Sequence, residues 1–197
     1  MTPFTTLTSI VVPLIRDNVD TDSIIPSREM KSTGKTDLAT GLFAPWRYAN
    51  AVARTENPEF VLNQPEYAQT QILASGANFG CGSSREHAVW ALAEYGIRCV
   101  IAESFAPIFY NNCIRNGLLP VILPHEAITA LAGTAITVDL AAQRANGHDF
   151  DIEAEAKTML IEGLDAIDLT LKHVDAIAAW QAADRAKRPW IYLGTAA

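Results

Sequence analysis

The middle of the chain alternates short apolar runs with segments of helical periodicity. The apolar runs predict three buried strands, at residues 71–74, 99–102 and 118–123. Between the first two, residues 83–95 carry apolar side chains at helical spacing, and Gly96 follows as a helix C-terminal glycine. A second helix is predicted after Ser104, whose side chain we expect to cap it, with Pro107 in its first turn. This β-α-β-α-β order predicts a parallel sheet with right-handed crossovers, and therefore the α/β fold class.

Less regular stretches flank this unit. Residues 5–15 and 135–140 predict two further strands, and Asn146-Gly147 is a turn pair that favours a hairpin with residues 150–152. Residues 161–185 predict a helical tail with a break near Lys172-His173. We expect its apolar face to pack on a neighbour, and that face comprises Leu164, Ile167, Leu171, Val174, Ile177 and Trp180. Residues 190–193 should dock on a surface too.

Composition narrows the class of protein. The 197 residues fit one domain with a substantial core, since 49% are hydrophobic and 19% are charged. The formal net charge is −7, and no cluster of Lys and Arg is present, so we expect no nucleic-acid partner. Any site for an anion must then be a local gathering of cations and backbone N–H groups.

No apolar run approaches the ~20 residues that span a bilayer. The first 13 residues also lack the basic start and long apolar stretch of a signal peptide, so we expect a soluble, cytoplasmic protein. The three cysteines are Cys81, Cys99 and Cys113. Their spacing contains no C-x-x-C pair, which argues against a disulfide framework and against an iron–sulfur site of the chain's own. Cys99 and Cys113 lie in apolar patterns and should be core residues.

The loop at residues 78–87 joins a predicted strand to a predicted helix, and its sequence is Asn-Phe-Gly-Cys-Gly-Ser-Ser-Arg-Glu-His. Ligands of open α/β sheets bind at this edge, and free N–H groups at a helix start favour anions. The segment matches neither a P-loop nor a dinucleotide fingerprint, because Lys is absent and Arg85 replaces the third glycine. The planar guanidinium of Arg85 can hold a carboxylate through two N–H groups. Ser83 and Ser84 add hydroxyls at the same place.

A structural interpretation is also open for each of these residues. Ser83 and Glu86 have the spacing of a capping box, in which each side chain bonds the other's backbone N–H. His87, in the first helical turn, is typical of a hydrogen-bonded structural histidine. The acidic segment 17–22 is typical of a solvated turn, and the functional alternative places Asp22 near the anion site, where it orients Arg85 or a substrate hydroxyl.

Three motifs resemble those of one family. Residues 80–87 resemble the signature of the mobile swivel domain of the aconitase superfamily. Residues 17–26 resemble the N-terminal motif of 3-isopropylmalate dehydratase small subunits, and residues 163–171 resemble the C-terminal motif of their longer bacterial form. The resemblance covers nearly the whole chain. It implies one aconitase-type swivel domain over residues 1–197, of three-layer β/β/α architecture with a mostly parallel sheet, and a helical extension from about residue 161.

The resemblance also implies an activity and a partner. It implies a hydro-lyase of leucine biosynthesis that interconverts 2-isopropylmalate and 3-isopropylmalate by dehydration and rehydration. A large subunit would carry a 4Fe-4S cluster as the Lewis acid, while this chain would hold no metal. Ser83 matches the serine that acts as base, Ser84 and Arg85 match ligands of a substrate carboxylate, and Asp22 matches an aspartate near the site.

The segment after Pro26 departs from the family pattern, in which a cation there reads the substrate. Arg28, Lys31 and Lys35 are all candidates for that role. Alternative substrates are therefore homoaconitate, citraconate or a methylated malate. A second class of function is a non-catalytic RNA-binding module, because swivel domains of related proteins bind RNA, although the charge of −7 argues against it.

Overall fold

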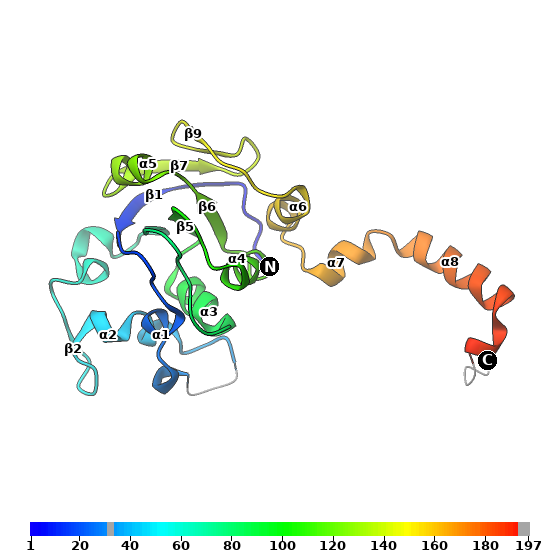
Figure 1. Ribbon diagram of the computed structural model, residues 1–197, viewed down its shortest axis with the longest axis horizontal. Coiled ribbons are helices and arrows are strands. Elements are labelled where there is room, and N and C mark those ends of the chain that lie inside the picture. Colours follow the sequence, from blue (N-terminus) through cyan, green and yellow to red (C-terminus); the bar gives the residue numbers. More distant parts are fainter. Residues whose placement is uncertain (31–33, 193–197) are drawn as a thin grey trace.

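The computed structural model describes residues 1–30 and 34–192. Its central unit is parallel, as predicted (Figure 1). Strands β4, β5 and β6 are adjacent and parallel, and helices α3 and α4 connect them. These elements are β4 at Ile72–Ala74, α3 at Glu86–Tyr95, β5 at Cys99–Ala102, α4 at Pro107–Arg115 and β6 at Leu119–Ile122. Pro107 is the first residue of α4, as expected where the N–H that proline lacks has no helical partner.

Strand β1, at Thr6–Pro13, links a parallel half of the sheet to an antiparallel half. Its last three residues pair with β4 in parallel, and its first five pair with β7 in antiparallel. The strand order is β6-β5-β4-β1-β7-β8-β9. The antiparallel elements after α5 (His125–Leu131) are β7 at Ala135–Asp139, β8 at Arg144–Ala145 and β9 at His148–Asp149. The Asn146-Gly147 turn is confirmed, but residues 150–152 are not a strand, because pairing stops at Asp149.

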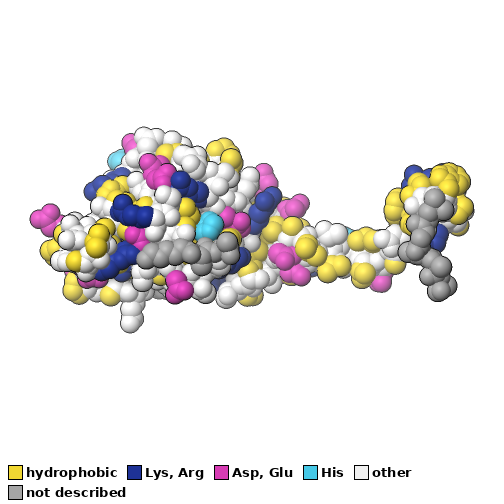
Figure 2. All heavy atoms as spheres, turned by 90° about the horizontal axis from the view of Figure 1, so that it is seen from below, with side chains coloured by type: hydrophobic (Ala, Val, Ile, Leu, Met, Phe, Trp, Pro, Cys, Tyr) yellow, Lys and Arg dark blue, Asp and Glu magenta, His cyan; other side chains and the backbone are white. Residues whose placement is uncertain are grey.

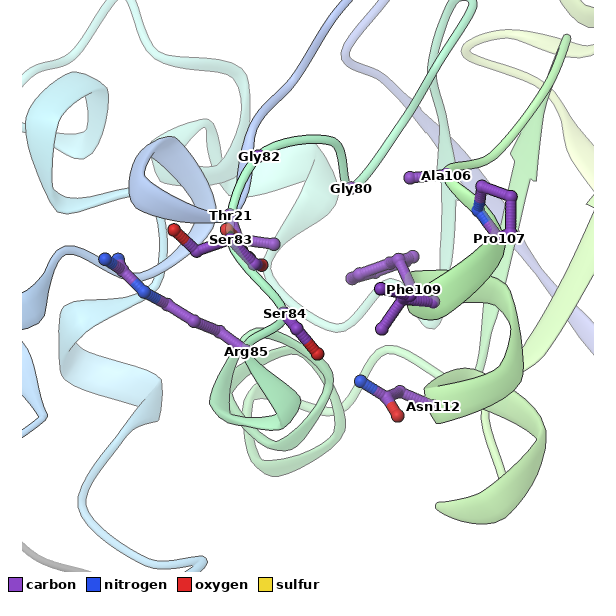
Figure 3. Close-up of a pocket in the computed structure, with 11 residues that line it drawn as sticks. Thr21, Gly80, Gly82, Ser83, Ser84, Arg85, Ala106, Pro107, Phe109 and Asn112 are labelled. Atoms are coloured by element: carbon purple, nitrogen blue, oxygen red, sulfur yellow. Dashed lines mark hydrogen bonds between the residues drawn. The ribbon is translucent and has the colours of Figure 1, made fainter.

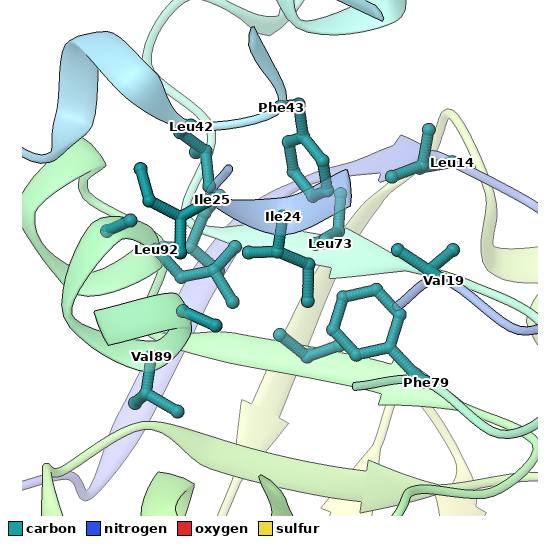
Figure 4. Packing of buried hydrophobic residues seen from close by; sticks show 14 of the residues in the cluster. Leu14, Val19, Ile24, Ile25, Leu42, Phe43, Leu73, Phe79, Val89 and Leu92 are labelled. Carbon is teal, nitrogen blue, oxygen red and sulfur yellow. The ribbon is translucent and has the colours of Figure 1, made fainter. Parts of the chain in front are cut away.

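Two hydrophobic cores lie on the opposite faces of the parallel half. Alternate residues of one strand enter different cores, so Leu73 belongs to the first, and Ile72 and Ala74 to the second. The first core packs α3, α4 and the segment 19–67 against the sheet, and includes Ile24, Phe79 and Leu92 (Figure 4). The second packs α5, α6 and the antiparallel strands against the other face. This layering confirms the predicted three-layer α/β class.

The segment between the acidic motif and β4 consists of short elements. Its helices and strands are α1 at Thr21–Ile24, α2 at Ala44–Arg47, β2 at Tyr48–Asn50 and β3 at Thr55–Glu56, with 3-10 turns among them. Three of its aromatic rings, those of Phe43, Trp46 and Phe60, pack together with centroids 5.7 to 6.4 Å apart. An irregular segment packed on the body was predicted here, and its aromatic side chains supply the contacts that its backbone does not.

The C-terminal residues form an arm that leaves the body (Figure 1). Helix α6, at Ala154–Glu162, packs in the second core, and Gly163 ends it. Helices α7 (Ala166–Leu171) and α8 (Val174–Lys187) follow and contain no buried residue. The break near Lys172-His173 is confirmed. The predicted packing of the tail is not found among the described residues, because Trp180 and Trp190 are 60% and 65% exposed, and Leu193 lies outside them.

Within the described ranges, no helix combines the length and hydropathy that a membrane crossing requires.

Candidate functional site

Two segments that are about 60 residues apart in sequence run side by side at the end of the sheet. The backbone N–H of Asn18 donates to the carbonyl of Ala77 (2.8 Å), and that of Thr21 donates to the carbonyl of Cys81 (2.9 Å). In return, the N–H of Gly80 donates to the carbonyl of Val19 (2.8 Å). These bonds attach the acidic motif to the glycine-rich loop, so residues of both motifs reach one place.

The two glycines of the loop have different reasons to be glycine. Gly80 has a φ of +77°, and a Cβ there would lie 2.1 Å from Cγ of Phe109, so a side chain has neither the conformation nor the space. Gly82 has a φ of +89°, but its Cβ would meet nothing nearer than 3.5 Å. Gly80 therefore allows α4 to pack closely, whereas Gly82 serves the turn alone.

Helix α3 begins three residues later than the sequence indicates. Its first residue is Glu86, and the residue before it, Arg85, forms no side-chain cap. The Glu86 carboxylate accepts a hydrogen bond from Nδ2 of Asn116 (2.7 Å) on α4. The capping-box interpretation of Ser83 is therefore wrong. Among the described residues the Ser83 and Ser84 hydroxyls form no hydrogen bond, while the carbonyl of Ser83 accepts one from Thr21 (2.9 Å).

Arg85 and Asp22 form an ion pair beside this loop. Nη1 of Arg85 donates to Oδ1 of Asp22, which lies in α1. The Arg85 side chain is 22% exposed and that of Asp22 is 57% exposed. Within the described part of the chain only Nη1 is bonded, so most of the five guanidinium N–H groups stay available to a ligand. The structure thus brings together four predicted site residues, namely Asp22, Ser83, Ser84 and Arg85.

A small cavity lies between the loop and the start of α4 (Figure 3). Its volume is about 80 Å³. The lining residues from the first motif and the loop are Thr21, Gly80, Gly82, Ser83, Ser84 and Arg85, and those from α4 and its entry are Ala106, Pro107, Ile108, Phe109 and Asn112. Pockets for whole ligands measure about 300–1,000 Å³, so this cavity accommodates one end of a molecule.

Sequence reasoning missed the α4 side of the cavity. Pro107 marks a helix start at the same edge of the sheet, and that signal could have pointed to this wall. The predicted cap for α4 is also wrong, because the Ser104 hydroxyl accepts from the N–H of Asn78 (2.8 Å) instead. Nothing in the pattern singles out Asn112.

The cations of the following segment lie elsewhere. Nε of Arg28 is 3.5 Å from the Glu29 carboxylate, and the Arg28 side chain is 58% exposed. Nζ of Lys35 donates to Oδ1 of Asn116 (3.1 Å) and lies over the ring of Trp90. Neither residue lines the cavity. Lys31 lies outside the described residues.

Two cysteines and a histidine outside the cavity have structural surroundings. Cys99 and Cys113 are buried as predicted, and burial raises the pKa of each thiol. The His87 ring packs against that of Trp90, with centroids 4.7 Å apart. In the ranges that the structure covers, no group of three or more His, Cys, Asp and Glu side chains is placed to hold a metal ion.

The fold is that of an α/β protein, and beside the start of α3 it forms a small cavity that is lined by two serines and an arginine. Comparison with known families agrees, because the aconitase C-terminal domain family matches residues 1–126. A second family, the C-terminal domain of the 3-isopropylmalate dehydratase small subunit, matches residues 167–192.

Comparison with individual proteins identifies the family more narrowly. A Cupriavidus necator protein named 3-isopropylmalate dehydratase small subunit is 52% identical over 205 residues, covering 98% of this chain and 99% of the relative. A Xanthobacter autotrophicus protein of the same name is 49% identical, covering 97% and 100%. A crystal structure of 3-isopropylmalate dehydratase from Methanocaldococcus jannaschii is similar, with a TM-score of 0.64 and 27% identity over 89% of this chain and 99% of that one. The chain belongs to the family of 3-isopropylmalate dehydratase small subunits, hydro-lyase subunits of the aconitase superfamily.

Proposed function

We propose that this chain is the substrate-holding subunit of an enzyme of leucine biosynthesis that interconverts 2-isopropylmalate and 3-isopropylmalate. The observation that carries the proposal is the convergence of Ser83, Ser84 and Arg85 around one cavity beside the start of α3, with Asp22 paired to Arg85. An arginine fork and uncapped helical N–H groups together favour a carboxylate. Both isopropylmalates present such a group beside the carbons that react.

Each residue has a distinct part in this scheme. Arg85 and Ser84 bind the substrate carboxylate, and Asp22 holds the guanidinium in place through Nη1. Ser83 Oγ, as the alkoxide, accepts the proton from the carbon next to the hydroxyl-bearing carbon while the double bond forms. It returns a proton when water is added back. Hydrogen-bond donors beside a cation are the surroundings that stabilise such an alkoxide.

The small cavity supports a two-chain enzyme. A volume of about 80 Å³ holds a carboxylate but not a whole isopropylmalate, which supports a site that a partner completes. We propose a large subunit that carries a 4Fe-4S cluster, which would supply a Lewis acid for the departing hydroxyl. We place the cluster on the partner because two of this chain's three cysteines are buried, which leaves Cys81 as the one thiol near the site.

Three further points complete the proposal. Residues 1–197 act as one swivel domain with a helical tail from about residue 161, in the cytoplasm. Arg28, Lys31 and Lys35 stay candidates for the cation that reads the substrate side chain. Homoaconitate, citraconate and a methylated malate remain alternative substrates.

Reconstitution tests the proposal. The chain alone should be colourless and inactive, and mixing it with the cluster-bearing large subunit should give turnover of 2-isopropylmalate above that of the alternative acids.

Arg85→Lys should lower kcat/KM by a factor that corresponds to about 2–4 kcal/mol of lost transition-state stabilisation, since Lys cannot bind a carboxylate through two parallel N–H groups. Arg144→Lys is the matched control, because Arg144 forms an exposed pair with Asp149 on a distant hairpin. Turnover of another acid in place of 2-isopropylmalate would overturn the substrate, and an unchanged kcat/KM would remove Arg85 from the site.

A further inference from the structure

Asn112 stands on the wall of the cavity that faces the two serines. It lies in the middle of α4, one turn after Ile108, and both line the cavity. Figure 3 shows the Ser84 hydroxyl and the Asn112 amide turned toward one another across the opening. Among the described residues the Asn112 side chain forms no hydrogen bond. Asn112 is partly buried in the cavity wall while its amide atoms stay accessible from the cavity, so the amide is free to bond a ligand there.

The backbone that carries this amide is held firmly. The carbonyl of Asn112 accepts two hydrogen bonds from Asn116, one from its backbone N–H (3.1 Å) and one from Nδ2 (2.9 Å). Oδ1 of Asn116 accepts from Nε1 of Trp90 (2.9 Å), and its Nδ2 also donates to Glu86 (2.7 Å). With the bond from Lys35, both donors and both lone pairs of the Asn116 amide are used. Asn116 therefore fixes α4 against the first turns of α3, and the distance across the cavity is set before a ligand arrives.

The chemistry of the wall complements that of the loop. Arg85 supplies the positive charge on one side, next to Asp22. An asparagine on the opposite side adds an N–H donor without adding a second charge, and a carboxylate has two oxygens that need donors. A carboxylate near Ser84 would thus be held from both sides, by the loop before α3 and by α4.

We propose that Asn112 is a further substrate-binding residue, whose side-chain N–H groups donate to the carboxylate held beside Ser84. This inference rests on the proposed function, because it assigns the cavity to a hydroxy-acid carboxylate. Ser84 and Asn112 then determine how that end of the substrate is oriented before Ser83 acts.

Kinetics of the reconstituted enzyme test the inference. Asn112→Ala should raise KM for 2-isopropylmalate about tenfold, the effect of losing one buried hydrogen bond worth about 1.4 kcal/mol. Asn112→Asp should raise KM at least tenfold further, because its charge repels the carboxylate, whereas Asn112→Gln should recover part of the loss.

The matched controls are Asn111→Ala and Asn111→Asp on the neighbouring position of α4, which is exposed and lines a different groove. These should stay within about twofold of the wild type. KM does not depend on how much enzyme is folded, so poor folding of a variant cannot imitate the result.

A binding measurement on the full chain separates this inference from the proposed function. In two-dimensional NMR with added L-malate, the side-chain NH₂ signals of Asn112 should shift together with the backbone signals of Ser84 and Arg85, and those of Asn111 should not. If Ser84 and Arg85 respond and Asn112 does not, or if Asn112→Ala and Asn112→Asp keep the wild-type KM, the role of Asn112 is overturned and the function stands. If Ser84 and Arg85 do not respond either, the anion site itself is absent and both proposals fail.

Discussion

Helix α3 in the body and helix α8 in the arm have the same kind of sequence pattern and opposite surroundings. Both place apolar side chains at helical spacing, over 10 and 14 residues. Helix α3 buries Ala88, Val89, Ala91 and Leu92, whereas α8 buries nothing. Figure 2 shows hydrophobic side chains spread along the arm, beyond the mixed surface of the body. The comparison teaches that periodicity reports which face of a helix is apolar, while burial depends on what lies opposite.

The largest expected difference is in the free energy of unfolding. Leu73→Ala removes a side chain of β4 that is fully buried in the first core, and should destabilise the chain by about 2–5 kcal/mol. Leu171→Ala, the same change at a position that is 53% exposed in α7, should cost less than about 0.5 kcal/mol. Chemical denaturation of both variants measures this. Equal costs would mean that the arm is packed as well as the body.

Polar contacts of the body should contribute less to the free energy of unfolding, and their contribution should depend on pH. The Glu94 carboxylate of α3 accepts from the N–H groups of Asp37, Leu38 and Ala39 at 2.6 to 2.8 Å. Desolvation raises the pKa of Glu94, but these three bonds outweigh it and lower the pKa below its usual value. The stabilisation is therefore present above the unfolded pKa of about 4.3 and is lost as the pH falls through the lower folded pKa.

Glu94→Gln tests this contact, because an amide offers one accepting oxygen in place of two. It should cost about 1–2 kcal/mol at neutral pH and remove part of the acid dependence. Denaturation at pH 7 and at pH 3 measures both effects, with Glu59→Gln as the control, since the Glu59 side chain forms no hydrogen bond in the described structure. An unchanged pH dependence in Glu94→Gln would remove Glu94 as its cause.

Removing a helix cap in the arm should destabilise that helix and not the body. Asp165 caps α7 by accepting from the N–H groups of Ile167 and Asp168, both at 2.8 Å, in a capping box. Asp165→Ala should weaken α7 by about 1 kcal/mol, seen as faster hydrogen exchange at these two amides, and leave unfolding of the body unchanged. Asp175→Ala in the first turn of α8 is the matched control, since it removes a charge but no cap. A fall in the stability of the whole chain would show that the arm and the body unfold together.

The smallest effect concerns an exposed pair on the body. Nδ1 of His125 lies 2.8 Å from the Glu103 carboxylate, and this hydrogen bond raises the pKa of His125. Its contribution is present below the unfolded pKa of about 6.5 and is lost as the pH rises through the higher folded pKa. NMR titration of His125 in the wild type and in Glu103→Gln should show the raised pKa only in the wild type. The same pKa in both proteins would exclude Glu103 as the cause.

Local patterns in the sequence determined most of the elements and part of the site. Strand β5 falls on the predicted residues, and α4 starts at Pro107, because apolar runs and proline act over a few neighbouring positions. Ser83, Ser84 and Arg85 are consecutive, so any fold keeps them together. The capping box expected at Ser83 and Glu86 did not form, because the Glu86 carboxylate bonds to Asn116, a partner 30 residues away, and the helix starts three residues later than predicted.

Only the tertiary structure decided which distant groups meet. It placed Asn112 across from Ser84 and left the apolar side chains of the arm exposed, whereas the pair of Asp22 with Arg85 had been expected from the functional interpretation of segment 17–22. Hydrogen bonds between the 17–22 segment and the glycine-rich loop, and the packing of Phe109 against Gly80, fix these relations. Such contacts join residues that are far apart along the chain, and residue spacing carries no information about them.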